Sequence, residues 1–174
     1  GITLSGGECL TQPDFAEGLL RCAKDYGLST AVESTAFAPF EVIEKILPHL
    51  DYYLMDIKHM NSAKHKEFTT QPNELILENA KKIAAYANTK LTIRVPVIPT
   101  FNDTEDEIAA IAEYAASLKV EQLHLLPYHR MGEDKYKGLG REYGMNNIYP
   151  PTNEKMQRLK RAAEQFDIKV QIGG

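Results

Sequence analysis

The sequence is poor in cysteine and has no excess of positive charge, and each shortage excludes a class of protein. Its two cysteines, Cys9 and Cys22, have neither the paired spacing of a zinc site nor the number that a disulfide framework needs. Lysine and arginine together number 20 against 24 acidic residues, which gives a net charge of −4. Such a balance lacks the basic surface that binds nucleic acid or an anionic membrane. The composition therefore predicts neither partner.

Long hydrophobic runs are also missing. No apolar run approaches the roughly 20 residues that cross a bilayer, and the opening residues lack the pattern of a signal peptide. We therefore expect a cytoplasmic protein. A length of 174 residues is enough for a single domain, 1–174, with its own core. The first residue is Gly1 rather than methionine and lies inside an apparent strand, so we expect a piece of a longer polypeptide.

The apolar residues alternate between the periodicity of strands and that of helices. Strands are predicted within 2–10, 28–35, 51–58, 91–99, 120–128 and 168–172, and helices at 14–26, 39–50, 73–86, 104–118 and 153–166. Pro96 predicts a bulge or strand end, because proline cannot donate to a ladder. Five β-α repeats and a closing strand indicate the α/β class, with parallel strands and outer helices.

Ionisable or hydroxyl side chains follow almost every predicted strand. They are Glu8, Glu33 with Ser34, Asp56 with Lys58, Arg94, and His129. Parallel α/β folds bind ligands beyond the carboxyl ends of their strands, so these side chains predict a binding site at one rim. Gly6 and Gly7 precede Glu8 and allow the backbone to come close to a ligand, although such a pair also occurs in ordinary turns.

The rim residues alone leave several functions open. A lysine at a strand end with nearby acids suits a Schiff-base aldolase, with Lys58 as the nucleophile. Asp56 and Lys58 lie two apart on a strand and so share a face, which is also compatible with a plain salt bridge. A binding domain without chemistry is a third possibility.

Four stretches in order resemble the activating enzymes of glycyl radical enzymes, of the pyruvate formate-lyase activating enzyme type within the radical S-adenosylmethionine (SAM) superfamily. The stretches are TLSGGE at 3–8, LMDIKHMN at 54–61, IRVPVIP at 93–99 and LLPYH at 125–129. The resemblance implies a partial (β/α) TIM-like barrel. It also implies reductive cleavage of SAM to a 5′-deoxyadenosyl radical, which generates a glycyl radical on a partner enzyme. The closest alternative is a radical SAM enzyme that acts on a small molecule.

The resemblance also assigns roles to individual residues. Glu8, after Gly6 and Gly7, corresponds to the carboxylate that meets the amino group of SAM. Lys58 corresponds to the lysine that faces the SAM carboxylate, and Asp56 to the aspartate near the reactive centre.

Three further positions follow from the same resemblance. His129 corresponds to a residue near the adenosine end of SAM. Glu33 and Ser34 correspond to an acid and hydroxyl pair that contributes to SAM binding and, in some members, holds a monovalent cation. Arg94 is expected to clamp the SAM carboxylate or the target peptide. Asp56, Lys58 and His129 are the expected catalytic residues.

The family holds a [4Fe-4S] cluster on three cysteines spaced Cys-x3-Cys-x2-Cys, and the sequence departs from this pattern. It contains no such motif, and Cys9 stands where the family usually has proline. Cluster assembly needs thiolate ligands. We therefore expect a fragment that lacks the first β/α unit, carries no cluster or other metal, and is inactive alone.

The expected partners are a glycyl radical enzyme as the protein substrate and flavodoxin or ferredoxin as the electron donor. The polar segment 130–151 is long enough to be functional. Its residues Tyr136, Lys137, Arg141 and Tyr143 are candidates for contact with the protein partner, and a solvated surface loop is the alternative.

Overall fold

The computed structural model describes residues 1–130, 136, 138–140, 144–145 and 147–173. Within these residues, six strands form one sheet in chain order, and every neighbouring pair is parallel. The strands are β1 (Ile2–Leu4), β2 (Thr30–Ser34), β3 (Tyr52–Asp56), β4 (Lys90–Val97), β5 (Gln122–Pro127) and β6 (Lys169–Ile172). All carboxyl ends therefore lie at the same edge.

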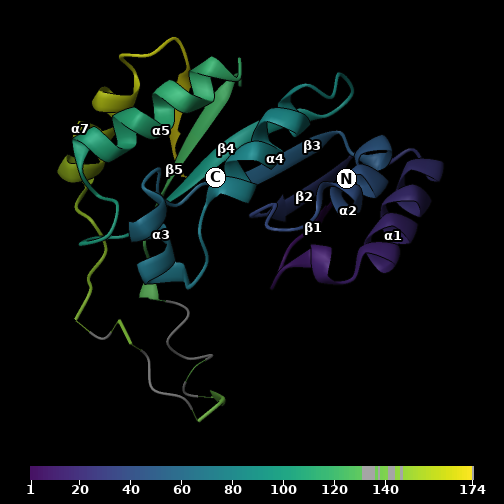
Figure 1. Ribbon diagram of the computed structural model, residues 1–174, viewed down its shortest axis with the longest axis horizontal. Helices are drawn as coiled ribbons and strands as arrows, with labels where there is room; N and C mark the ends of the chain where they lie inside the picture. The colour runs from purple at the N-terminus through teal and green to yellow at the C-terminus, as the bar shows by residue number, and fades with distance from the viewer. Residues whose placement is uncertain (131–135, 137, 141–143, 146, 174) are drawn as a thin grey trace.

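Helices connect the strands (Figure 1). The α-helices are α1 (Pro13–Asp25), α2 (Phe40–Ile46), α3 (Ser62–Thr69), α4 (Glu74–Ala84), α5 (Glu105–Ser117) and α7 (Asn153–Ala163), and the 3-10 turns are η1 (Cys9–Thr11) and η2 (Leu47–His49). Figure 1 shows α3 beyond the carboxyl ends of the strands, near the residues that follow β5. Its place puts α3 beside the predicted rim.

The two faces of the sheet differ because side chains alternate along each strand. One set is apolar and buried in the core beneath the helices: Val32, Tyr53, Met55, Ile57, Leu91, Ile93, Val95, Val97, Leu123, Leu125 and Val170. The alternate positions carry Glu33, Asp56, Arg94 and His124, which are only partly buried. We call the first set the helix face and the second the inner face.

The predicted fold class is confirmed. The strands are parallel, the helices lie outside, and the sheet remains open, since β1 and β6 each pair with one strand among the described residues. This arrangement is a partial barrel. The helix α3 was not predicted, because it is short and has little amphipathic pattern.

Pro96 neither ends β4 nor interrupts its pairing with β5, where it lies opposite Leu126. The predicted bulge is therefore wrong, whereas the predicted strand end is confirmed within one residue, at Val97. Arg94 accepts a hydrogen bond from the backbone of Ile57, so the side of β4 that Arg94 and Pro96 share faces β3. The last β3 residue paired with β4 is Asp56, opposite Arg94. Pro96 thus lies beyond the residues of β4 that pair with β3, so its missing N–H leaves no hydrogen bond between these strands unmade.

Segment 130–151 is only partly described. Lys137, Arg141 and Tyr143 lie outside the described residues, whereas Tyr136 is described and exposed. No helix in the described parts of the chain has the length and apolar character needed to cross a membrane.

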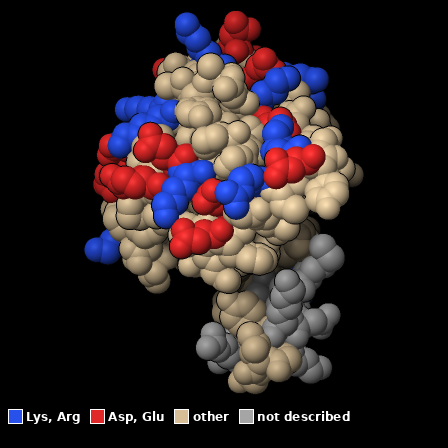
Figure 2. Space-filling view, turned by 90° about the vertical axis from the view of Figure 1, so that its right-hand side faces the viewer, with Lys and Arg blue, Asp and Glu red and all other residues tan. Residues whose placement is uncertain are grey.

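The face that carries α1 and α2 shows interleaved basic and acidic side chains (Figure 2). Two of its ion pairs join Lys24 to Asp51 and Lys45 to Asp14. The charges on this face therefore alternate in sign.

Candidate functional site

An ion cluster occupies the inner face near the carboxyl ends of β2, β3 and β4. Arg94 lies opposite Asp56 in the strand register and donates to its Oδ1 from Nε at 2.9 Å and from Nη2 at 2.8 Å. Its Nη1 lies 2.7 Å from Oε1 of Glu33 on β2. One guanidinium therefore holds two carboxylates that would otherwise repel each other.

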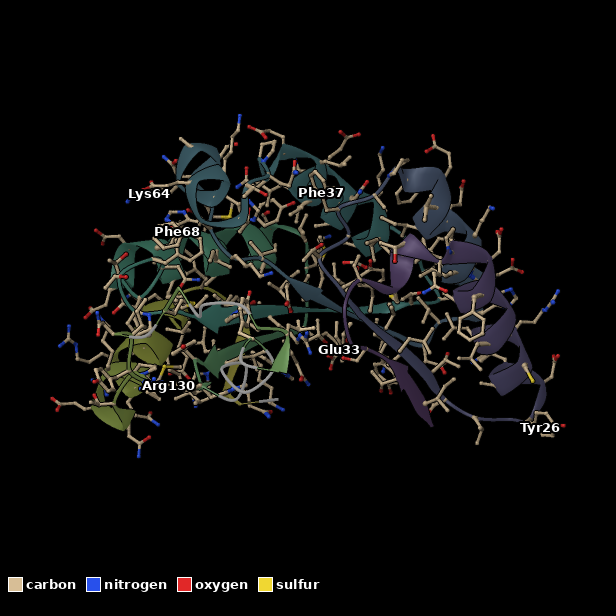
Figure 3. All side chains as sticks on the ribbon, turned by 90° about the horizontal axis from the view of Figure 1, so that it is seen from below. Tyr26, Glu33, Phe37, Lys64, Phe68 and Arg130 are labelled. Carbon is tan, nitrogen blue, oxygen red and sulfur yellow. The ribbon has the colours of Figure 1, made fainter. Side chains whose placement is uncertain are left out.

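Glu33 has a second partner, because Ser5 donates its hydroxyl to Oε2 at 2.7 Å. Burial by itself would raise the pKa of Glu33, but the hydrogen bond from Ser5 and the ion pair with Arg94 outweigh it and lower the pKa. In Figure 3, Glu33 lies near the middle of the strand array, away from the helices at its margins. The carboxylate is thus held ionised on the inner face.

The Gly-Gly loop is attached to β2 at both of its ends. Ser5 bonds to Glu33 at one end, and Glu8 bonds to Ser34 at the other. Gly6 lies between them with φ of 116°, a backbone conformation that side chains strongly disfavour. Apart from the adjoining residues, no atom of the described part of the chain lies within 4 Å of the position that a Cβ would take on Gly6 or Gly7. The loop therefore leaves open space at the rim.

Glu8 is held by four internal N–H and O–H donors, and the Cys9 thiol is a weaker donor to Oε1 at 3.9 Å. Oε1 accepts from the Ser34 hydroxyl at 2.7 Å and the Leu10 backbone at 3.2 Å. Oε2 accepts from the Thr35 backbone at 3.2 Å and its hydroxyl at 3.1 Å. Ionised carboxylates have about four lone-pair sites, so a ligand amine at Glu8 must share or replace one of these bonds.

Lys58 and His129 differ from Glu8, because their side chains have no partner among the described residues. Lys58 is half-buried just beyond β3, and its ammonium makes no hydrogen bond or ion pair with any described residue. The alternative of an Asp56–Lys58 salt bridge is not formed, because Asp56 pairs with Arg94. His129 follows β5 and is exposed, again without a side-chain partner among the described residues. Both side chains remain available to a ligand.

The structure therefore groups the predicted residues into two sets. Glu33, Asp56 and Arg94 form the inner-face cluster, and Arg94, expected as a clamp for a ligand, is occupied by those two carboxylates. Glu8 and Ser34 form a bonded pair at the rim.

Four polar residues around the loop after β3 were not predicted: the buried His59, Asn73 and Asn102, and the partly buried Glu107. Only His59 lies close behind an otherwise apolar strand, so position after a strand could have indicated it alone.

The cysteines do not suit an iron–sulfur cluster. Cys9 is half-buried and Cys22 is exposed on α1. Burial and the neighbouring Glu8 raise the pKa of the Cys9 thiol to about 11, which disfavours the thiolate that binds metal. Within the described part of the chain, no three His, Cys, Asp or Glu side chains are grouped so that they could hold a metal ion.

Comparison with known proteins gives one consistent result. Residues 1–115 match the family model described as the Radical SAM superfamily. The indoleacetate decarboxylase activating enzyme of Tractidigestivibacter scatoligenes is 34% identical over 172 residues, covering 99% of this chain and 55% of that protein. The isethionate sulfite-lyase activating enzyme of Desulfovibrio desulfuricans is 46% identical over 149 residues, covering 85% of this chain and 48% of that protein.

A solved structure agrees with these matches. The crystal structure of a domain of pyruvate-formate lyase-activating enzyme from Bacteroides vulgatus superposes with a TM-score of 0.82 at 32% identity, covering 100% of this chain and 99% of that one. The chain spans about half the length of the curated relatives that it matches.

Proposed function

This chain belongs to the radical SAM superfamily, among the activating enzymes of glycyl radical enzymes, and we propose that it forms the SAM-binding rim of such an enzyme. The observation that carries the proposal is the half-buried Lys58 just beyond β3, which has no side-chain partner among the described residues and lies beside the carboxylates that Arg94 holds. A cation with open access at the carboxyl edge of a parallel sheet suits the carboxylate of an amino acid ligand.

The rim offers complementary groups to the rest of SAM. Glu8 would accept the ligand's amino group in exchange for one of its bonds to Thr35, and the open space beside Gly6 and Gly7 would admit the ligand backbone. His129 would lie toward the adenosine end. When bound and reductively cleaved, SAM supplies a 5′-deoxyadenosyl radical, and the residues named here orient it.

The cluster that the family uses does not fit the cysteines of this chain, so its ligands would come from residues outside these 174. The supporting observation is that the curated relatives are about twice as long. An electron donor such as flavodoxin or ferredoxin would serve the intact enzyme in the cytoplasm. By itself, this chain would be inactive.

The protein substrate is proposed as a glycyl radical enzyme. The two curated relatives described above are named for different partners, a decarboxylase and a sulfite-lyase. Pyruvate formate-lyase, suggested by the resemblance, is therefore one candidate among several.

The test is SAM cleavage by the intact protein, reconstituted anaerobically with its cluster. We expect Lys58→Met to lower the rate of 5′-deoxyadenosine formation at limiting SAM by at least about tenfold, because the ligand carboxylate loses its cation. Lys81→Met on α4 is the matched control, since Lys81 is exposed and has no ion pair among the described residues. Equal rates in the two variants would refute the role of Lys58.

Two further measurements separate the alternatives. Electron paramagnetic resonance of a candidate partner would show a glycyl radical if the partner is the substrate. Borohydride trapping with a carbonyl compound would give a stable Lys58 adduct only if the chain were a Schiff-base enzyme.

A further inference from the structure

A buried polar cluster lies beneath the loop that carries Lys58. Asn102, which is 0% exposed, donates from Nδ2 to the carbonyl oxygens of Lys58 at 2.7 Å and Pro96 at 2.8 Å. Its Oδ1 accepts from the backbone of Ile98 at 2.7 Å. Both amide hydrogens are used, and this one side chain joins the segments that follow β3 and β4.

A second buried amide binds the next two residues of the loop. Asn73 donates from Nδ2 to the carbonyl oxygens of His59 at 2.7 Å and Met60 at 2.9 Å. Three successive carbonyls, from Lys58 to Met60, are thus fixed by two buried side chains. The backbone beneath the Lys58 side chain has little freedom to shift.

His59 and Glu107 complete the cluster. The backbone of Asn61 donates to Nδ1 of His59 at 3.0 Å, and the backbone of Met60 donates to Oε1 of Glu107. These two acceptor atoms lie 3.0 Å apart, and their side chains are only 3% and 13% exposed. Two acceptors at this distance repel unless a proton lies between them.

The surroundings of the pair favour its neutral form. Phe101 packs against the His59 ring at 5.3 Å between centroids, and Phe68 stacks on Phe101 at 4.1 Å. Burial raises the pKa of Glu107 and lowers the pKa of His59. Lys64 and His65 on α3 lower the pKa of His59 further. Lys64 also acts to lower the pKa of Glu107, but burial outweighs it. Figure 3 shows Lys64 and Phe68 together on this helix.

We propose that Asn73, Asn102, His59 and Glu107 form an anchor that positions Lys58, and that Glu107 donates a shared proton to Nδ1 of His59. The inference rests on the proposed function, because it takes Lys58 as the cation for the ligand carboxylate. The Lys58 side chain has a flexible four-carbon stem and no partner among the described residues, so the anchored backbone sets where its ammonium can reach. The four anchor side chains are positioning residues.

The first test removes the anchor without changing its size. Asn102→Asp replaces a donating amide with an acceptor that faces two carbonyls, and Asn88→Asp, on the exposed turn before β4, is the control. In the intact, cluster-loaded protein we expect Asn102→Asp to weaken SAM binding at least about tenfold, since small displacements of binding groups are costly. The control should bind SAM as the wild type does.

The second test addresses the proton. Glu107→Gln stays neutral, but its amide must shift to keep both contacts, because Oε1 of Glu107 alone accepts from Met60 and lies beside Nδ1. Glu107→Ala removes both contacts. We expect the Gln variant to lose about threefold in SAM affinity, and the Ala variant about tenfold. Equal losses in both variants would mean that a charged pair is needed and would overturn the shared proton.

A spectroscopic readout on this chain is independent of activity. Nitrogen NMR of the five histidine rings, with His59 assigned from a His59→Asn variant, should show His59 neutral at pH 6.5 with Nδ1 unprotonated. A protonated His59 ring at that pH would overturn the inference.

Lys58→Met distinguishes the two proposals. If it abolishes SAM binding while Asn102→Asp has no effect, the anchor is only structural and the proposed function stands. If Lys58→Met has no effect on binding, the proposed role of Lys58 fails, and the anchor's role in ligand binding fails with it.

Discussion

The two faces of the sheet use the same strands for different purposes. On β4, Ile93 and Val95 point to the helix face and are fully buried, whereas Arg94 between them points to the inner face and pairs with charges from two other strands. Apolar burial stabilises the fold without specifying any chemistry. Charges on the inner face are retained at a desolvation cost that their mutual pairing offsets. Because side chains alternate along each strand, the residues that stabilise the fold lie on the helix face and the ion cluster of the candidate site lies on the inner face.

The largest expected effect is on the helix face. Ile93→Ala should lower the free energy of unfolding by about 2–5 kcal/mol, because it removes a buried side chain and leaves a cavity. Its neighbour Thr92 lies on the inner face, is 9% exposed and lines an open pocket of about 520 Å³. Thr92→Ala should therefore cost less than about 1 kcal/mol. Urea unfolding measures both, and similar losses would contradict the separation of the two faces.

The next effect is on the inner-face cluster. Arg94→Met keeps the aliphatic stem but leaves Glu33 and Asp56 without their shared cation. We expect a loss of roughly 2–3 kcal/mol at neutral pH, less than for a fully buried pair because both carboxylates are partly exposed. Carbon NMR of the carboxyl groups should show the pKa of Glu33 rising in the variant. An unchanged Glu33 titration would contradict the pairing.

A smaller effect is expected in the Gly-Gly loop, where the strain is in the backbone alone. Gly6→Ala should cost about 1–2 kcal/mol from its φ of 116° alone, because no atom of the other described residues would meet the new Cβ. Gly7→Ala has the same open space without a positive φ, so it should be close to neutral. Urea denaturation of the two variants compares them directly. If Gly7→Ala proved as costly as Gly6→Ala, backbone strain would not be the cause.

Much of the fold could be predicted because apolar periodicity is a local signal. The strand 51–58 and the helix 104–118 are both present within a few residues, and Thr104 caps α5 by accepting from the backbone of Glu107. The helix α3 lacked such a pattern. The absence of a bulge at Pro96 could not be predicted, because it depends on where the neighbouring strand β3 ends, which only the register shows.

The candidate site could be predicted only in part, because its contacts depend on which strands are neighbours and not on local sequence. Residue type and position after a strand indicated Glu33, Asp56, Lys58 and Arg94. Their pairing could not be predicted, because it depends on which strands are neighbours and on which residues lie opposite. The buried amide of Asn102 was missed since it follows its strand by several residues and acts on another loop, at Lys58.

The smallest expected effect is the acid dependence of the inner face. The pKa of Glu33 is lower in the folded chain than its ordinary value of 4.5, so its contribution to stability is present above pH 4.5 and is lost as the pH falls through the folded pKa. Glu33→Gln should therefore reduce the loss of stability below pH 4.5. Glu113→Gln is the control, because Glu113 is exposed on α5 and has no ion pair among the described residues. Solvent screens the partly exposed Glu33, which keeps the effect small. Urea midpoints measured from pH 6 down to about 3 would show it, and identical acid profiles for the two variants would mean that the bonds to Ser5 and Arg94 contribute nothing to folding.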